Sequence, residues 1–289
     1  MTNTNYNKIY RLQNNEREVK MYRGFRLDFG IDDKKYYEIG CRIYNDFKNK
    51  VNVQLYDLTD NGVIDGAKLE SNWFPQINAD VFLSHSHKNE KQAITFAGWL
   101  KDKFKLTTFI DSCIWGYSND LLKDVDNIYC KLSKSSSYSY NRRNQSTSHI
   151  HMILNCALLK MIDNTECIFF LDTAEAVTTK TVFDEDRTYS PWLYSELLMT
   201  KLVRKMEREV HRSTQIKKSK SLNEDLIISY DIDLDHMDKI SVNILDRWLL
   251  NYENLERTHN SRYFEDIKYP LNILYNIVPI NENKLLKEY

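Results

Sequence analysis

The sequence predicts an α/β fold, a three-layer sandwich in which helices cover both faces of a mostly parallel central sheet. Short apolar runs alternate along the chain with segments whose apolar residues recur at helical spacing. This alternation is typical of parallel sheets, whose strands are buried on both faces. The 289 residues suffice for one large domain with an extension. We expect a small N-terminal α/β extension over residues 1–77 and a main domain over residues 78–289.

The N-terminal part has weaker patterns. Apolar residues near helical spacing predict a helix from Lys34 to Lys50, although Gly40 inside it disfavours helix. Residues 51–55 alternate like a strand, and Asn61-Gly62 is a strong turn signal. No function can be derived from this part.

The first strand of the main domain is predicted at Val81 to Leu83. Ser84, His85, Ser86 and His87 follow it, and the next segment has the helical spacing Ala93, Phe96, Ala97, Leu100. In open α/β sheets, residues just past the carboxyl end of a strand line the ligand crevice. Ser84 and His85 are therefore candidate binding residues, with helix capping as the alternative role.

The second strand is predicted within Leu106 to Ser112 and also ends in polar residues, Asp111 and Ser112. We expect a loop over Cys113 to Tyr117 that carries Trp115, and then a helix with the apolar stripe Leu121, Leu122, Val125 and Ile128. The polar stretch Ser133 to Ser148 is too long for an ordinary connection. It predicts a functional loop or mobile insertion around residues 131–148.

Four later elements complete the pattern. The apolar spacing from Ile150 to Met161 predicts a helix, and Cys167 to Asp172 a third strand. Ser190-Pro191 is a helix start, with serine as N-cap and proline in the first turn, and this helix should run to about Val210. A fourth strand is expected at Leu226 to Tyr230, with helices around residues 240–248 and 269–278.

Composition narrows the class of protein. The formal net charge is −1, from 40 basic and 41 acidic residues, so no nucleic-acid partner is expected. No apolar run approaches the ~20 residues of a membrane span, and no signal-peptide pattern follows Met1. The five cysteines are odd in number and contain no CxxC pair. We expect reduced thiols in a cytoplasmic protein without a membrane partner.

These pieces, in this order, resemble the Toll/interleukin-1 receptor (TIR) domain over residues 78 to 280. Asp80 to Ser86 matches the first strand and its serine-containing turn. Phe109-Ile110-Asp111 matches the end of the second strand, which in the family precedes the BB loop. Ser190, Trp192 and Glu196 match the pattern Ser-x-Trp-x-x-x-Glu after the third strand. The resemblance implies a TIR/flavodoxin-like sheet.

The resemblance also implies an activity. In enzymatic TIR domains, the glutamate of this pattern cleaves the nicotinamide–ribose bond of NAD, so Glu196 is the expected catalytic residue. Trp192 lies on the same helical face, four residues earlier. The remaining expected substrate-binding residues are Ser84, His85, Asp111, Ser112 and Trp115. NAD is then a substrate, and neither a cofactor nor a metal is expected.

The sequence departs from the family pattern in its N-terminal extension, in the insertion from Ser133 to Ser148 and in the polar spacer before Ser190. These departures look most like those of bacterial TIR proteins of the Thoeris-like, antiphage-defence type. The resemblance implies a homo-oligomer or filament formed through TIR–TIR contacts. It also implies an ADP-ribose-derived product, linear, cyclic or conjugated, that a separate effector protein senses.

Two other functions remain open. His85-x-His87 and His149-x-His151 could bind a metal together with Asp111 or Asp235, but an i, i+2 pair faces one way only on a strand. A non-enzymatic TIR interaction module is the main alternative, and in it Glu196 would have no catalytic role. Arg142 and Arg143 could contact a pyrophosphate, although a solvated loop pair is the simpler interpretation.

Overall fold

The computed structural model describes residues 23–27, 32–48, 59–60, 63–64, 66–74, 76–132, 136–173, 187–188, 190–202, 230–231, 234–258 and 269–279. All structural statements below concern these residues. No helix among them is long and apolar enough to cross a membrane.

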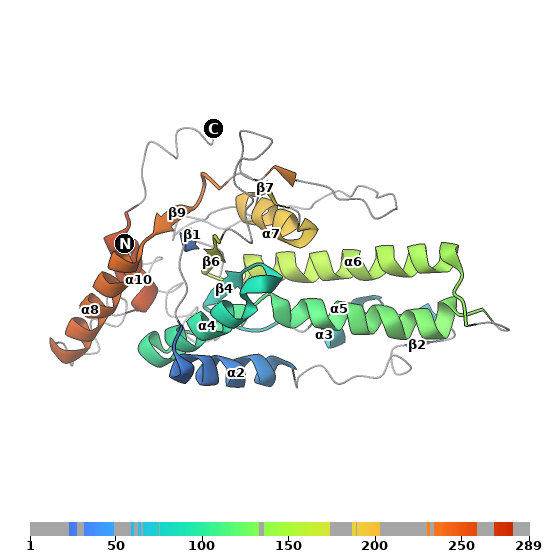
Figure 1. Cartoon of the computed structure of the whole chain (residues 1–289), viewed down its shortest axis with the longest axis horizontal. Helices are drawn as coiled ribbons and strands as arrows, with labels where there is room; N and C mark the ends of the chain where they lie inside the picture. Colours follow the sequence, from blue (N-terminus) through green and yellow to red (C-terminus); the bar gives the residue numbers. More distant parts are fainter. Residues whose placement is uncertain are drawn as a thin grey trace, which may run out of the picture.

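A five-stranded, all-parallel sheet forms the centre of the molecule (Figure 1). Its strands, in spatial order, are β5 (Thr108–Ile110), β4 (Val81–Ser84), β6 (Cys167–Leu171), β1 (Arg23–Leu27) and β9 (Asp238–Ile240). Every residue of β4, β5 and β6 is buried, as expected for parallel strands covered on both faces. The predicted α/β sandwich is confirmed.

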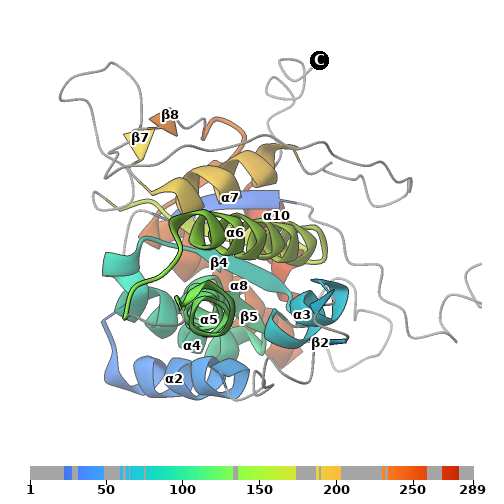
Figure 2. The ribbon, with the colours of Figure 1, turned by 90° about the vertical axis from the view of Figure 1, so that its right-hand side faces the viewer.

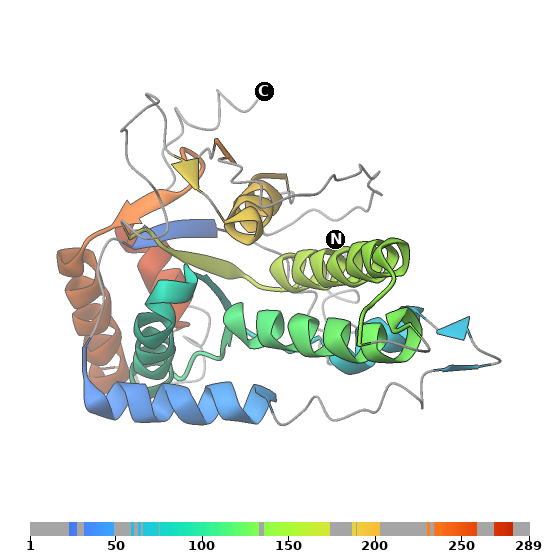
Figure 3. The same ribbon diagram turned by 45° about the vertical axis from the view of Figure 1, so that its right-hand side comes forward.

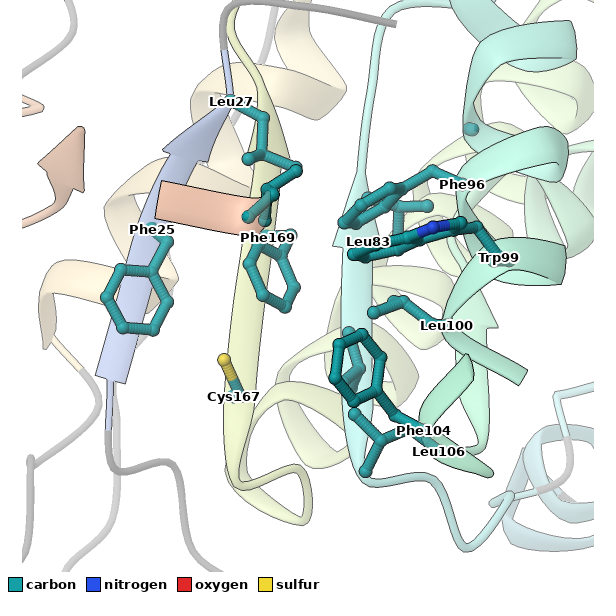
Figure 4. Close-up of a cluster of buried hydrophobic side chains, with 14 of the residues drawn as sticks. Phe25, Leu27, Leu83, Phe96, Trp99, Leu100, Phe104, Leu106, Cys167 and Phe169 are labelled. Atoms are coloured by element: carbon teal, nitrogen blue, oxygen red, sulfur yellow. The ribbon is translucent and has the colours of Figure 1, made fainter. Parts of the chain in front are cut away.

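Two hydrophobic clusters form the core, one on each face of the sheet. Because successive side chains of a strand point to opposite faces, Val81 and Leu83 join one cluster and Phe82 the other. Figure 4 shows part of the first cluster, where Leu83 and Phe169 from the sheet meet Phe96 and Trp99 from a helix.

Helices supply the rest of both clusters (Figure 2). The cluster around Leu83 contains residues of α2 (Lys34–Lys48), α4 (Glu90–Phe104), α8 (Val242–Thr258) and α10 (Pro270–Ile277). The cluster around Phe82 contains residues of α3 (Gly66–Trp73), α5 (Ser112–Val125), α6 (Tyr140–Asp163) and α7 (Pro191–Leu202). The shorter elements are η2 (His87–Asn89), the π-turn η3 (Asp126–Cys130), the strand pair β2 (Thr59–Asp60) and β3 (Val63–Ile64), and the strand pair β7 (Arg187–Thr188) and β8 (Tyr230–Asp231).

Strand β1 corrects the predicted domain boundary. It lies between β6 and β9 in the central sheet, although its residues fall in the segment 1–77 that was predicted to form a separate extension. Its two arginines are neutralised by distant carboxylates. Arg23 pairs with Asp238, and Arg26 Nε and Nη2 donate to Asp172 Oδ2 at 2.9 and 2.6 Å. These pairs allow a strand that looks polar in sequence to occupy an interior position.

Two glycines bring α2 and α4 into close contact. A Cβ added at Gly98 would lie 1.9 Å from the carbonyl oxygen of Tyr36, and one added at Gly40 would lie 1.9 Å from that of Ile94. The two backbones therefore approach too closely for any side chain at these positions. Gly40, which disfavours the helix in sequence, is what lets α2 pack on α4.

Two local predictions need correction, and a third lies mostly outside the described residues. Of the strand expected at Leu226 to Tyr230, only Tyr230 is described; it belongs to β8, which pairs antiparallel with β7. The loop predicted over residues 113–117 is the first part of α5, because the helix begins at Ser112. The expected BB loop after β5 is therefore absent from this described segment.

The predicted insertion around residues 131–148 is largely helix, since α6 begins at Tyr140. Its serine- and asparagine-rich first turns are fixed by a buried carboxylate on the neighbouring π-turn. Asp126 accepts hydrogen bonds from Ser146 Oγ at 2.6 Å and from Arg143 Nε at 2.8 Å. Other expectations lie outside the described residues, namely the strand at residues 51–55 and the continuation of α7 beyond Leu202.

Candidate functional site

Four buried polar residues meet at the carboxyl ends of β4 and β5. They are Ser84, His85, Asp111 and Glu196, and none is more than 1% exposed. The connection after β4 leads to β5 on one side, whereas the connection after β6 leads to β9 on the other side, so the strand order reverses between β4 and β6. Such a reversal of strand order is where open α/β sheets bind ligands.

Helix α7 carries Glu196 to this edge. Its start is fixed at Ser190, whose Oγ accepts from the Leu193 N–H at 3.3 Å and whose own N–H donates to Thr188 Oγ1 at 3.1 Å. The serine N-cap followed by Pro191 was predicted from sequence and is confirmed. Glu196 then lies in the second turn, on the side of the helix that faces the sheet.

A short hydrogen bond joins Glu196 to the end of β4. Ser84 Oγ donates to Glu196 Oε2 at 2.6 Å, and both side chains are buried. The second oxygen, Oε1, is buried without a hydrogen-bond partner among the described residues. The Asp111 carboxyl is close enough to hydrogen-bond with Glu196 when one of the two is protonated, so a ligand group that binds Glu196 would compete with that contact.

Asp111 follows β5 and accepts hydrogen bonds from two backbone N–H groups. Its Oδ1 accepts from the Ser112 N–H at 2.7 Å, which caps α5, and its Oδ2 accepts from the His85 N–H at 3.1 Å. His85 Nδ1 also lies 2.5 Å from Asp111 Oδ1. Asp111 thus ties the turn after β4 to the start of α5.

Burial determines the protonation of the cluster. It raises the pKa of Glu196 well above its usual value, and the nearby charge of Asp111 raises it further. Burial raises the pKa of Asp111 to about 8, against the hydrogen bonds from the His85 and Ser112 amides. Burial lowers the pKa of His85 to about 4. At neutral pH the closed cluster therefore favours protonated carboxyls beside a neutral imidazole.

The other predicted site residues lie around this cluster in different ways. Ser112 is buried and contributes its backbone N–H. Trp192 is partly buried and packs edge-on against His151 of α6, with ring centroids 5.1 Å apart. Trp115 lies in α5, and its side chain is outside what the structure describes. Arg142 and Arg143 lie on α6 and contact η3, where Arg142 Nη1 donates to the Tyr129 carbonyl.

The histidine pairs do not form a shared site. His85 is buried whereas His87 is exposed, because the chain turns into η2 between them. Within the described ranges, no group of three or more histidine, cysteine or acidic side chains is arranged to hold a metal ion.

Sequence reasoning missed part of this sheet edge. Asp172 follows β6 as Asp111 follows β5, and it binds Arg26 of β1. Thr173 Oγ1 donates to the buried Asn89 at 2.7 Å. The polar residue after an apolar strand was a usable signal for Asp172. Its partner was not predictable, because β1 was not recognised as a strand of this sheet.

Comparisons with known proteins add no family assignment. No protein-family model matches the chain, and neither the curated proteins nor the solved structures contain a significant match.

Proposed function

We propose that this protein cleaves the nicotinamide–ribose bond of NAD, with Glu196 as the catalytic residue. One observation carries the proposal: Glu196 reaches the carboxyl end of β4, where Ser84 binds it, at the reversal of strand order. The Ser190, Trp192, Glu196 pattern that suggested this chemistry in sequence begins α7 there. The family resemblance behind it rests on the sequence motifs alone.

The chemistry requires a carboxylate near the ribose. The nicotinamide ring is cationic in NAD and leaves as a neutral molecule, so no acid has to protonate it. Positive charge moves to the ribose in an oxocarbenium-like transition state, as in glycoside hydrolysis. An ionised Glu196 would stabilise this charge. Ser84 would hold one carboxyl oxygen and leave Oε1 for the sugar.

The closed cluster holds Glu196 in its neutral form, and the substrate itself can reverse this. A positive charge within a few ångströms lowers a carboxyl pKa, and the nicotinamide ring brings such a charge. Because Glu196 is fully buried, the proposal also requires a rearrangement that exposes it. We therefore propose a weakly active isolated chain that gains activity on self-association, in a homo-oligomer or filament.

The proposed setting follows from the same resemblance. We propose a cytoplasmic protein of bacterial antiphage defence, in which an ADP-ribose-derived product signals to a separate effector protein. Hydrolysis would yield ADP-ribose, whereas attack by another hydroxyl or nitrogen nucleophile would yield a cyclic or conjugated product.

A second candidate is a non-enzymatic interaction module. The complete burial of Ser84, Asp111 and Glu196 favours it, since a closed polar network is able to fix the turn after β4 without binding a substrate. An interaction module of this kind would release no nicotinamide from NAD.

One experiment separates the two candidates. Purified protein is incubated with NAD over a wide range of protein concentrations, and nicotinamide and ADP-ribose products are followed by chromatography and mass spectrometry. Glu196→Gln keeps the shape and removes the charge, so we expect a loss of about a hundredfold or more. Glu253→Gln, an exposed glutamate on α8, is the matched control and should keep full activity.

We expect the specific activity to rise steeply with protein concentration. A rate that is flat across the range would contradict activation by association. Absence of nicotinamide release at every concentration, or equal rates for the Glu196→Gln variant and the unmodified protein, would leave the interaction module.

A further inference from the structure

Helices α5 and α6 run side by side and extend away from the sheet (Figures 1 and 3). Their far end, which we call the hairpin tip, comprises η3, residues 131–132 and residues 136–143. An isolated bridge pairs Lys131 with Tyr138 across the turn. This tip lies apart from the cluster around Glu196 and plays no role in the proposed reaction.

The π-turn inverts the expected pattern of burial at the tip. The helical spacing places Ile128 on the buried stripe with Val125. In the structure Val125 and the charged Asp126 are buried, whereas Ile128 is 38% exposed. A π-turn adds one residue to a helical turn and so rotates the side chains that follow it. Such turns occur mostly as single insertions, often at functional sites.

A polar network holds this inverted arrangement in place. The buried carboxylate of Asp126 is bound by Ser146 and Arg143 of α6. Tyr138 donates its hydroxyl hydrogen to Asn127 Oδ1 at 2.6 Å, and the Arg143 guanidinium lies 5.5 Å from the centre of the Tyr138 ring. These contacts fix the conformation of the tip and thereby determine which of its side chains face solvent.

The outward side chains are apolar. Of the eight large hydrophobic residues exposed in the described ranges, four lie between residues 128 and 140. They are Ile128 at 38%, Leu132 at 46%, Tyr138 at 36% and Tyr140 at 65% exposure. Such clustering of exposed apolar side chains marks an interaction site.

Apart from the buried Asp126, the charged side chains in the described part of the tip are cations. From residue 127 to residue 162 the sequence contains no aspartate or glutamate, although the whole chain holds 41 acidic residues. In the described part of the tip, Lys131, Arg142 and Arg143 are exposed. A near-neutral net charge thus conceals a locally cationic surface.

We propose that the hairpin tip docks on an anionic lipid surface. The apolar side chains would enter the boundary between headgroups and acyl chains, and the cations would meet lipid phosphates and carboxylates. The rings of Tyr138 and Tyr140 could also stack on nucleic-acid bases, but the aliphatic side chains Ile128 and Leu132 beside them favour the acyl-chain boundary of a membrane.

The test measures binding of the full chain to sedimented vesicles. Vesicles of phosphatidylcholine with about a third phosphatidylserine should bind the protein, pure phosphatidylcholine vesicles should bind it far less, and added salt should weaken binding. Equal binding to both kinds of vesicle, or none to either, would overturn the proposal. Binding of a single-stranded or duplex DNA oligonucleotide in place of vesicles would overturn it as well.

Variants locate the contact. Replacing Lys131 and Arg142 by glutamine should weaken binding about 25-fold, since each cation near such a surface contributes about fivefold. Glutamine at Lys101 and Lys103 of α4 is the matched control. Replacing Ile128 and Leu132 by serine should also abolish most binding, and Leu250→Ser, at an exposed leucine of α8, should not. If tip and control variants bind alike, the tip is not the contact.

Discussion

The protonation of the buried carboxyls gives a sharp prediction for Glu196→Gln. Glu196 in the folded chain holds its proton at neutral pH, because burial raises its pKa well above the usual value. In the unfolded chain the same carboxyl is ionised above its model value of 4.5. Glutamine copies the shape of the protonated acid and cannot ionise. The variant should therefore differ from the unmodified protein in how stability depends on pH.

The expected magnitude follows from proton linkage. A carboxyl that is protonated when folded and ionised when unfolded costs about 1.4 kcal/mol of unfolding free energy per pH unit, and stability falls as pH rises. Asp111, whose pKa is about 8 in the folded chain, behaves in the same way below pH 8. The unmodified protein should therefore lose stability more steeply with rising pH than Glu196→Gln does, by on the order of 1 kcal/mol per pH unit.

The pH range of the experiment has to lie outside the range in which His85 titrates. Burial lowers the pKa of His85 to about 4, so between pH 4 and its unfolded value of 6.5 this residue makes stability rise with pH. Between pH 7 and 8 His85 is largely neutral in both states. Urea unfolding in this window, followed by tryptophan fluorescence, gives the two slopes. Equal slopes for the unmodified protein and Glu196→Gln would refute the reasoning, since Glu196 would then be ionised in the fold. Glu253→Gln should keep the unmodified slope.

Two further predictions concern the core and the site. Gly98→Ala should destabilise the fold by about 3 kcal/mol or more, because its Cβ would overlap the Tyr36 carbonyl. Gly66→Ala, with open space around it, is the control and should not lower the thermal midpoint. A small effect at Gly98 would contradict the close contact of α2 and α4. Ser84→Ala should cost about 1–2 kcal/mol in thermal or urea unfolding, and it should move any NAD-cleaving activity to higher pH. The reason is that the Ser84 hydrogen bond favours the ionised form of Glu196, so an unchanged pH–rate profile would argue against that role.

The elements that sequence predicted well are those whose signal is local. The apolar runs before Ser84 and Asp111 are β4 and β5, and the serine–proline start of α7 lies where it was expected. From these positions, and from the rule that strand ends meet at one edge, Ser84 and Asp111 could be placed near each other before any coordinates, whereas Glu196 was expected there only from the family resemblance.

The elements that sequence missed depend on distant partners. Strand β1 contains two arginines among its five residues, and only Asp172 and Asp238, more than 140 positions away, make it suitable for the interior. The first turns of α6 were predicted as an insertion for a related reason. Their serines and asparagines disfavour helix, and the contact of Ser146 and Arg143 with Asp126 overrides that preference. Pairings of this kind leave no periodic signal in a single sequence.

The pH dependence connects the stability of the cluster to its proposed chemistry. If the cluster only held the turn after β4, an apolar side chain at Glu196 would serve at least as well, since replacing buried charged groups by apolar ones is often neutral or stabilising. A carboxyl whose ionisation weakens the fold is instead expected where the charge itself is used. Rising pH should then lower stability and raise NAD cleavage together, because both follow from the ionisation of the same two carboxyls. Opposite responses of stability and activity to pH would therefore support the enzyme, whereas a loss of stability without any cleavage would support the interaction module.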